Sequence, residues 1–204
     1  MAAVHDDSTS TPDAAVHERC LVCRSSNIAP LPGYERCYLA RCAACTFVFV
    51  SRVPTAEELD AHYTATYQEN EQGYEWLSPV TSARFDEWLE MMAPYQGTTS
   101  RILDVGCGVG HFLVHAQAKG WEAHGTEYPD HAVAICMRHG INMHAGPLQP
   151  ENYDPESFDV VTSLGVIEHI NDPVNEVRKF HAVLRPGGLL WICLLYTSPS
   201  PRDS

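Results

Sequence analysis

The alternation of hydrophobic and polar positions changes character at about residue 100. Beyond that point, short apolar runs alternate with capped helical segments, a pattern typical of βαβ units around a parallel sheet. The pattern predicts five strands, at residues 101–105, 121–126, 141–145, 158–163 and 189–192. It also predicts three helices, at residues 109–119, 129–139 and 172–184. The second half of the chain is therefore predicted to be an α/β domain.

The first half of the chain has a different pattern. Its polar start predicts a disordered tail. Strands are expected at residues 34–41 and 46–50, and Thr55 with Glu58 has the spacing of a capping box that begins a helix. A further helix is predicted at residues 79–92, with its apolar side chains on one face. The predicted division is a tail (1–18), a cysteine-containing domain (19–53), a helical linker or lid (54–97) and the α/β domain (98–192).

Composition and charge narrow the class of protein. Apolar residues make up 45% of the chain and charged residues 19%, which is enough for a packed core. The net charge of −13 would repel a phosphate backbone, so nucleic-acid binding is disfavoured. The first twenty residues lack the features of a secretory signal, and the apolar run at residues 187–196 is too short to cross a membrane. We therefore expect a soluble cytoplasmic protein.

Four of the eight cysteines form two C-x-x-C pairs, Cys20 with Cys23 and Cys42 with Cys45, separated by eighteen residues. This spacing is typical of a zinc ribbon, in which each pair directs two thiolates at one tetrahedral ion. Disulfides are the alternative, but they need an oxidising compartment. Cys37, in a predicted strand, could substitute for one ligand. Because four thiolates leave no open position, the predicted Zn²⁺ is structural.

A glycine-rich loop follows the first strand of the predicted α/β domain. Asp104, Gly106, Gly108 and Gly110 lie where this strand ends and a helix begins. Glycines let the backbone approach a ligand, and the start of a helix directs N–H groups toward it. The dinucleotide fingerprint would need a glycine at His111, so the loop either binds another nucleotide-sized ligand or only makes a tight turn.

An acidic residue follows the second predicted strand. Glu127 comes 23 positions after Asp104, where a carboxylate can accept the hydroxyls of a ribose that is held at the loop. An exposed glutamate without a ligand is the alternative. The combination of loop and carboxylate favours the ribose role.

Four segments now resemble a known family: ILDVGCGVGHF, GTEY, FDVVTSLGVIEHINDP and LRPGGLLWI. Their order and spacing are similar to those of class I S-adenosylmethionine-dependent methyltransferases, most closely the ubiquinone-biosynthesis-type O-methyltransferases. The N-terminal half is similar to methyltransferases with a CxxC…CxxC ribbon, an arrangement found among sugar C-methyltransferases and natural-product enzymes. The resemblance implies a Rossmann-like α/β sheet, incomplete at five strands, preceded by a zinc ribbon and a helical segment.

The resemblance implies a role for each position that matches the family. The methionine end of the cofactor would be held by four loop residues, Asp104, Gly106, Gly108 and Gly110. The ribose and adenine would lie beside Glu127 and Tyr128, and the reaction side would be lined by Leu164 and Gly165. Many relatives have an acidic residue that binds the adenine amine, but this chain has Gly-Pro-Leu at residues 146–148. That contact would come from the backbone or be absent.

Methyl transfer to a hydroxyl or an acidic carbon also requires removal of a proton. Glu168 and His169 follow the fourth predicted strand and are the candidate bases, His169 because imidazole titrates near neutral pH. The alternative is that both residues only orient the loop before Asp172. Sugar C-methyltransferases usually have a tyrosine where this chain has Val166, so O-methylation of a small-molecule acceptor is favoured over C-methylation.

Two other functions stay open, a catalytically silent adaptor and a ribosomal-RNA methyltransferase, the latter disfavoured by the acidic charge. Three tyrosines in the helical segment could close a lid over the cofactor or simply pack: Tyr63, Tyr67 and Tyr74. Residues 193–204 resemble the read-through of a sequencing adapter, so the natural sequence is expected to stop near Ile192. The fifth strand would then be an apolar edge and the fragment could be inactive. The oligomeric state is not indicated by the sequence.

Overall fold

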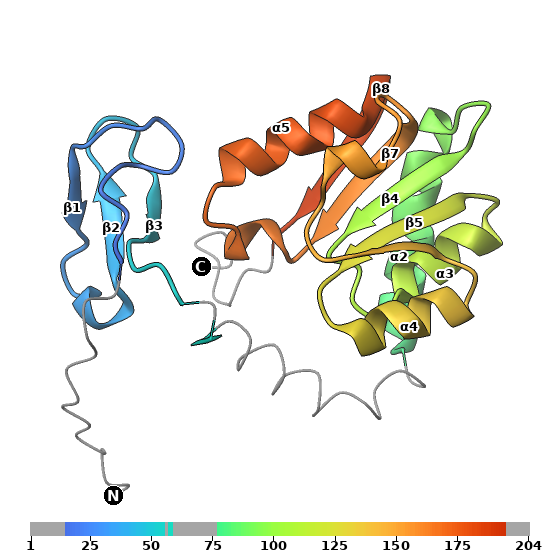
Figure 1. Ribbon diagram of the computed structural model, residues 1–204, viewed down its shortest axis with the longest axis horizontal. Helices are drawn as coiled ribbons and strands as arrows, with labels where there is room; N and C mark the ends of the chain where they lie inside the picture. Colours follow the sequence, from blue (N-terminus) through green and yellow to red (C-terminus); the bar gives the residue numbers. More distant parts are fainter. Residues whose placement is uncertain (1–14, 56, 59–76, 195–204) are drawn as a thin grey trace, which may run out of the picture. The chain divides into compact units, whose positions relative to one another are not determined.

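The computed structural model describes residues 15–55, 57–58 and 77–194 (Figure 1). The chain divides into two compact units, Met1–His62 and Tyr63–Ser204. We describe each unit by itself. Within the described residues, no helix is long and apolar enough to cross a membrane.

Three predictions fall wholly or partly outside the described residues. They are the disordered tail up to residue 14, the tyrosine lid and the adapter-like segment from residue 195. The start of the helix at Thr55 is described, and its capping box is present. The Thr55 N–H donates to Glu58 Oε2 over 2.8 Å, and the Glu58 N–H donates to Thr55 Oγ1 over 3.2 Å.

The first unit contains a three-stranded antiparallel sheet in the order β1-β2-β3. Its strands are β1 (Ile28–Pro30), β2 (Leu39–Cys42) and β3 (Val48–Val50). Alternate residues of a strand face opposite sides, and one side of this sheet is buried. Its small core is formed by Cys20, Leu21, Ala40, Cys42 and Phe49.

Two expectations for this unit are corrected by the structure. The strand predicted at residues 34–41 is instead a 3-10 helix, η1 (Glu35–Cys37), followed by the shorter strand β2. Tyr38 separates them with a φ of 54°, which no strand residue adopts. The end of the predicted tail is also ordered, because the His17 N–H donates to Ser51 O and Val16 pairs with Arg52.

The second unit is an α/β domain with a five-stranded parallel sheet in the order β6-β5-β4-β7-β8 (Figure 1). Its strands are β4 (Arg101–Val105), β5 (Glu122–Glu127), β6 (Asn142–Ala145), β7 (Phe158–Leu164) and β8 (Leu184–Cys193). The strand order reverses between β4 and β7. In open α/β sheets, ligands bind at the carboxyl ends of the strands beside such a reversal.

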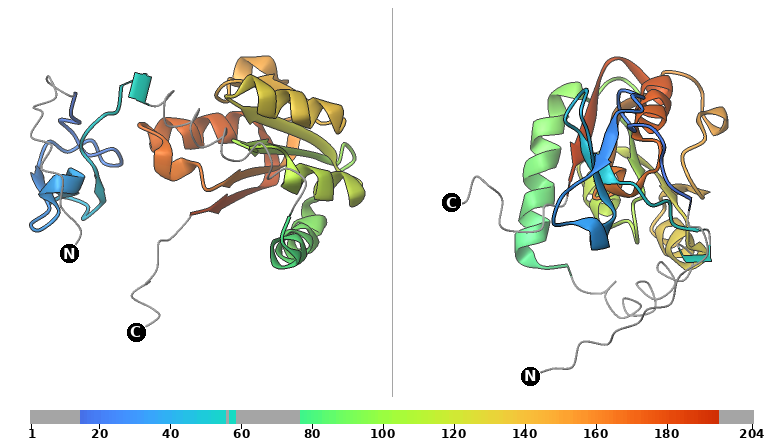
Figure 2. Two further views of the ribbon diagram at one scale, coloured as in Figure 1. Left: turned by 90° about the horizontal axis from the view of Figure 1, so that it is seen from below. Right: turned by 90° about the vertical axis from the view of Figure 1, so that its left-hand side faces the viewer.

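Helices cover both faces of this sheet; Figure 2 shows α2 and α5 on opposite sides. The helices are α2 (Pro79–Met92), α3 (His111–Ala118), α4 (Asp130–Arg138) and α5 (Pro173–Val183). The 3-10 helices are η3 (Ala93–Tyr95), η4 (Pro150–Asn152) and η5 (Ile167–His169). One core lies under α2, α3 and α4 and includes Ile102 and Val160. The other lies under α5 and includes Leu103 and Val161.

Helix α2 has the bounds that the sequence predicts, but it does not lie in a separate linker. Ser78 caps its first turn by accepting the Thr81 N–H over 3.1 Å, and proline follows at the first helical position. Leu89 and Met92 are buried in the core of the α/β domain. The structure therefore assigns this helix to the domain itself.

The last strand begins earlier than the sequence predicts. Leu184 already pairs with Phe158, so β8 includes the Pro-Gly-Gly segment that was expected to be a loop. The reason is Asp159, whose buried carboxylate accepts hydrogen bonds from the Arg101 N–H, Thr99 Oγ1 and the Arg185 guanidinium. These hydrogen bonds hold the start of β8 against β7. Burial raises the pKa of Asp159, but the hydrogen bonds from Arg185, Arg101 and Thr99 together outweigh it and lower the pKa.

Candidate functional site

The glycine loop lies between the carboxyl end of β4 and the start of α3. All three glycines have positive φ, with values of +75° at Gly106, +57° at Gly108 and +82° at Gly110. The Gly106 and Cys107 N–H groups both donate to Thr126 O, over 2.9 Å and 3.1 Å. The loop is thus anchored to the end of the neighbouring strand β5.

The surroundings of the three glycines differ. A Cβ at Gly106 would lie 2.5 Å from Val166 Cγ2, and one at Gly110 would lie 2.7 Å from Ile141 Cδ1. A Cβ at Gly108 would meet no atom within 4 Å. Gly106 and Gly110 are therefore required by packing, whereas Gly108 faces open space that a ligand can enter.

Glu127 connects the loop to the end of β5. Its side chain is buried, and its Oε2 accepts the Gly108 N–H over 2.7 Å. Its Oε1 accepts the Tyr128 N–H, also over 2.7 Å. Each carboxylate oxygen can accept a second hydrogen bond. The predicted pair of glycine loop and acidic residue is therefore brought together, with the carboxylate held by two backbone donors.

Asp104 is buried inside the sheet beside this carboxylate. Its side chain accepts a hydrogen bond from Thr162 Oγ1 over 2.7 Å. Burial raises the pKa of Asp104 to about 7; the Thr162 hydrogen bond opposes this change, and the charge of Glu127 adds to it. Thr162 was not identified from the sequence, although a polar residue inside an otherwise apolar strand is a usable signal.

The variant Asp104→Asn is expected to remove one pH-dependent contribution to stability. Because the pKa of Asp104 is raised in the folded chain, its contribution is fully present below the unfolded pKa of about 4. It is lost as the pH rises through about 7, which lowers the free energy of unfolding by up to about 4 kcal/mol. Urea unfolding of both proteins at several pH values measures this difference.

Asparagine still accepts a hydrogen bond from Thr162, but it does not titrate. The two proteins therefore differ in one ionisable group only, the carboxyl group of Asp104. The unfolding free energy of the wild type, relative to the variant, should fall between about pH 4 and about pH 7. A difference that is constant over this range would contradict the assignment to Asp104.

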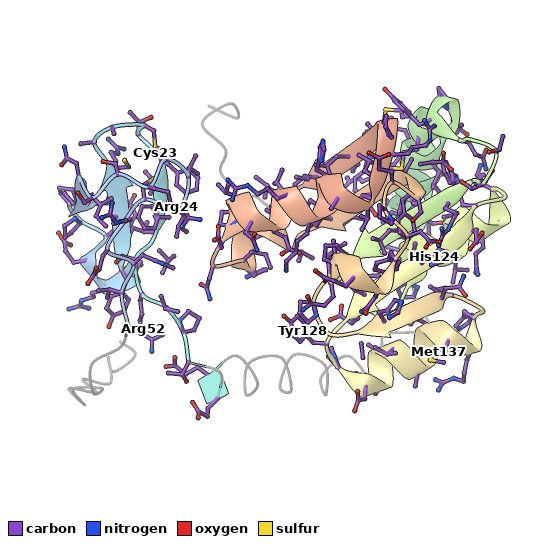
Figure 3. All side chains as sticks on the ribbon, turned by 45° about the horizontal axis from the view of Figure 1, so that its top comes forward. Cys23, Arg24, Arg52, His124, Tyr128 and Met137 are labelled. Carbon is purple, nitrogen blue, oxygen red and sulfur yellow. The ribbon has the colours of Figure 1, made fainter. Side chains whose placement is uncertain are left out.

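The other predicted cofactor residues lie at the carboxyl ends of β5 and β7. Tyr128 is 58% exposed, and Figure 3 shows its side chain outside the sheet. Leu164 packs against the core under α2, and Gly165, with a φ of +69°, donates its N–H to Cys193 O. In the place of the expected acidic residue, the Gly146 N–H donates to the backbone carbonyl of Glu127.

The two candidate bases also lie on this edge of the sheet. Glu168 and His169 are exposed in the short helix η5, one turn after β7. The His169 N–H donates to Val166 O over 2.9 Å, and Asp172 caps the following helix by accepting the Asn175 N–H. Capping is thus performed by Asp172, and the side chains of Glu168 and His169 lie at the surface.

The four predicted metal ligands meet in the first unit. Their sulfur atoms all lie within 4.8 Å of one another. Cys20 Sγ lies 3.6 Å from Cys45 Sγ, and Cys23 Sγ lies 3.5 Å from Cys42 Sγ. These distances exceed the disulfide length of about 2.0 Å. They approach the separation of about 3.8 Å between thiolates on one tetrahedral zinc.

Both cysteine pairs have the same backbone turn. The Arg24 N–H donates to Cys20 O, and the Thr46 N–H donates to Cys42 O. Arg24 and Thr46 each follow the second cysteine of their pair and adopt positive φ, 61° and 65°. Burial opposes ionisation of Cys42, but hydrogen bonds from the Cys45 and Ala44 backbone and from the Cys23 and Cys45 thiols together outweigh it and lower its pKa to about 7. Cys37 is exposed and lies outside the cluster.

The family and sequence comparisons both identify methyltransferases as relatives of this chain. The methyltransferase domain family matches residues 75–203. Ubiquinone biosynthesis O-methyltransferase from Albidiferax ferrireducens is 31% identical over 122 residues, covering 55% of this chain and 47% of that protein. The corresponding protein from Paracidovorax citrulli is 32% identical over 114 residues, covering 52% and 46%. The chain spans about half the length of the curated relatives it matches.

Two solved structures share the fold of the second unit. Phosphoethanolamine N-methyltransferase 2 from Haemonchus contortus, in complex with S-adenosyl-L-methionine, is 24% identical with a TM-score of 0.52, covering 64% of this chain and 33% of that one. A SAM-dependent methyltransferase from Archaeoglobus fulgidus is 20% identical with a TM-score of 0.50, covering 61% and 56%. The chain therefore belongs to the methyltransferase domain family, and its predicted resemblance to the class I S-adenosylmethionine-dependent methyltransferases is confirmed.

Proposed function

We propose that the second unit binds S-adenosylmethionine at the glycine loop and transfers its methyl group to a small-molecule acceptor. The observation that carries this proposal is the hydrogen bond between Glu127 and the Gly108 N–H, which places a buried carboxylate beside the open position of the loop. The cofactor supplies an electrophilic methyl group on a sulfonium. The protein has to bind and orient it and to accept a proton from the acceptor.

The residues at the site fit this cofactor. Gly108 leaves open space at the loop, and Glu127 can accept further hydrogen bonds from ribose hydroxyls. Glu127 places an acidic group beside the loop, which suits a cofactor that carries a positive charge. Calorimetric titration of the chain with S-adenosylmethionine tests the proposal directly. Saturable one-to-one binding is expected, and absence of binding by folded protein would reject it.

We further propose that the acceptor atom is a hydroxyl oxygen. The curated relatives are named as O-methyltransferases, and Val166 packs over Gly106 where sugar C-methyltransferases usually have a tyrosine. A hydroxyl loses its proton on methylation, and His169 is exposed at the edge of the sheet where an acceptor would approach. We assign His169 as the general base that accepts this proton. Glu168, the adjacent residue, is the second candidate for the same role.

Replacing His169 by alanine is expected to lower the rate of methyl transfer by about a hundredfold, because general bases contribute on this scale. Transfer of radiolabelled methyl groups from S-adenosylmethionine to a panel of small hydroxyl-bearing acceptors measures the rate. Affinity for S-adenosylmethionine should stay unchanged, since His169 is assigned to the acceptor. His181→Ala, an exposed histidine of α5, is the matched control. Equal rates for both variants would contradict the role of His169.

We also propose that the cysteine cluster binds one structural Zn²⁺. The four sulfurs are close enough to share one ion, and their number fills a tetrahedral shell. Such a site holds the two turns of the first unit together rather than activating water. A reducing compartment keeps these thiols available, so we place the protein in the cytoplasm.

A further inference from the structure

Two cysteine thiols that the proposed function does not use meet at one carbonyl of the glycine loop. Cys107 Sγ lies 3.7 Å from Gly108 O. Cys136, on α4, donates to the same oxygen over 3.4 Å. The N–H of Gly108 donates to Glu127. Gly108, the open position of the loop, is therefore held by a carboxylate on one side and by two thiols on the other.

Glycines make the room that the two thiols occupy. A Cβ at Gly125 would lie 2.8 Å from Cys107 Sγ, and a Cβ at Gly110 would lie 2.8 Å from Cys136 Sγ. Cys136 is completely buried and Cys107 is half-buried. Both sulfurs thus lie against the glycine loop, Cys107 in the loop beside β5 and Cys136 on α4.

The two thiols also interact with each other. Their mutual interaction raises the pKa of Cys107, an effect to which burial adds, and lowers the pKa of Cys136 against the opposing effect of burial. A thiol whose pKa is lowered by a neighbouring thiol is the arrangement found in reactive cysteine pairs.

We propose that Cys107 and Cys136 are an oxidisable pair, whose disulfide ties the glycine loop to α4. With hydrogen peroxide as the oxidant, the S–S bond forms and the O–O bond breaks. Both thiol protons leave in two water molecules, and two electrons pass from the sulfurs to the peroxide. The disulfide removes both S–H donors from Gly108 O. Its effect on the cofactor rests on the proposed function, but its formation does not.

Peptide mapping of the full chain tests whether the disulfide forms. Lys119 lies between the two cysteines, so trypsin releases them in separate peptides, residues 102–119 and 120–138. After peroxide treatment and alkylation of free thiols, mass spectrometry should find these two peptides linked, and dithiothreitol should separate them. Cys37, exposed and alone in peptide 37–41, is the internal control. Recovery of both peptides alkylated, when Cys37 is oxidised, would overturn the proposal.

Calorimetry with S-adenosylmethionine tests the consequence of the disulfide. Oxidation of the wild type and of the control variant Cys37→Ser should weaken binding by about tenfold, and dithiothreitol should restore it. Cys136→Ser should bind equally before and after oxidation. If the linked peptides form but the wild-type affinity for S-adenosylmethionine does not change, the proposed effect of the disulfide on the glycine loop would be overturned. Failure of the reduced chain to bind would instead reject the proposed function, and the peptide map would still decide the disulfide.

Discussion

Replacing Glu127 by alanine is expected to weaken S-adenosylmethionine binding by about a hundredfold. The substitution removes the acceptor for the Gly108 and Tyr128 N–H groups and the proposed acceptor for the ribose hydroxyls. Hydrogen bonds to a charged group contribute about 1.5–3 kcal/mol each, so the loss of the ribose contacts alone corresponds to this factor. Isothermal titration calorimetry measures the affinity of both proteins.

Two variants show whether the effect belongs to the carboxylate. Glu127→Gln keeps the size of the side chain but directs an amide N–H toward one of the two backbone donors, so intermediate affinity is expected. Glu122→Gln changes a glutamate at the other end of β5, whose partner is His124, and should leave affinity unchanged. Equal affinities for the wild type and Glu127→Ala, with both folded, would contradict the ribose assignment.

Replacing Cys42 by serine is expected to abolish zinc binding and to unfold the first unit. Cys42 is fully buried and lies in both the cysteine cluster and the small core beneath the sheet. A structural zinc contributes about 10–16 kcal/mol of apparent binding free energy, far more than a core of this size can supply. Protein purified under reducing conditions should contain about one zinc per chain, and the variant should contain none.

Limited trypsin digestion reports the folding of the same unit. Arg24, Arg36 and Arg41 are cleavage sites inside it, and they should become rapidly cut in Cys42→Ser or after treatment with a chelator. Cys37→Ser is the matched control, since Cys37 is exposed and lies outside the cluster. Zinc content and protease resistance that are the same in the wild type and Cys42→Ser would contradict a four-thiolate site.

The α/β domain could be predicted because its central strands β4, β5 and β7 are mostly buried and its strands appear as short runs between capped helices. Asp172 shows such a cap, since it accepts the Asn175 N–H at the start of α5. Helix α2 was placed correctly in sequence but assigned to a linker. Its apolar face does not reveal which core it packs against, since that depends on tertiary contacts.

The candidate site was predicted in part. The glycine loop and Glu127 have a recognisable spacing, and the structure brings them together. The contact between Asp104 and Thr162 joins residues 58 positions apart, and it depends on the register of β4 and β7, which no local pattern encodes. The contact of the two thiols with Gly108 O also depends on tertiary packing. Cys107 and Cys136 look like small core residues until α4 packs beside the loop.

The first unit shows a different limit of prediction from the sequence. The pairs of cysteines were sufficient to predict the cluster, but the strand at residues 34–41 was wrong. Its tyrosine and leucine residues favour a strand, and tyrosine gives no sign that Tyr38 adopts positive φ. Arg24 and Thr46 also adopt positive φ. Each of them closes the turn of a cysteine pair by donating its N–H to the carbonyl of the first cysteine. Metal-ligand spacing therefore predicts where ligands meet better than it predicts the backbone between them.

The reversal of strand order between β4 and β7 divides the sheet into two halves, and each half comes from one contiguous stretch of the sequence. Residues 101–145 form β4, β5 and β6 with the loop and Glu127, which under the proposed function recognise a cofactor common to all methyltransferases of this kind. Residues 158–193 form β7 and β8 with η5, where the acceptor would lose its proton. Under the proposed function, substitutions in the second stretch are expected to change the acceptor, whereas substitutions in the first stretch are expected to change the affinity for the cofactor. A lineage with this topology can diversify its chemistry by altering one contiguous part of its coding sequence.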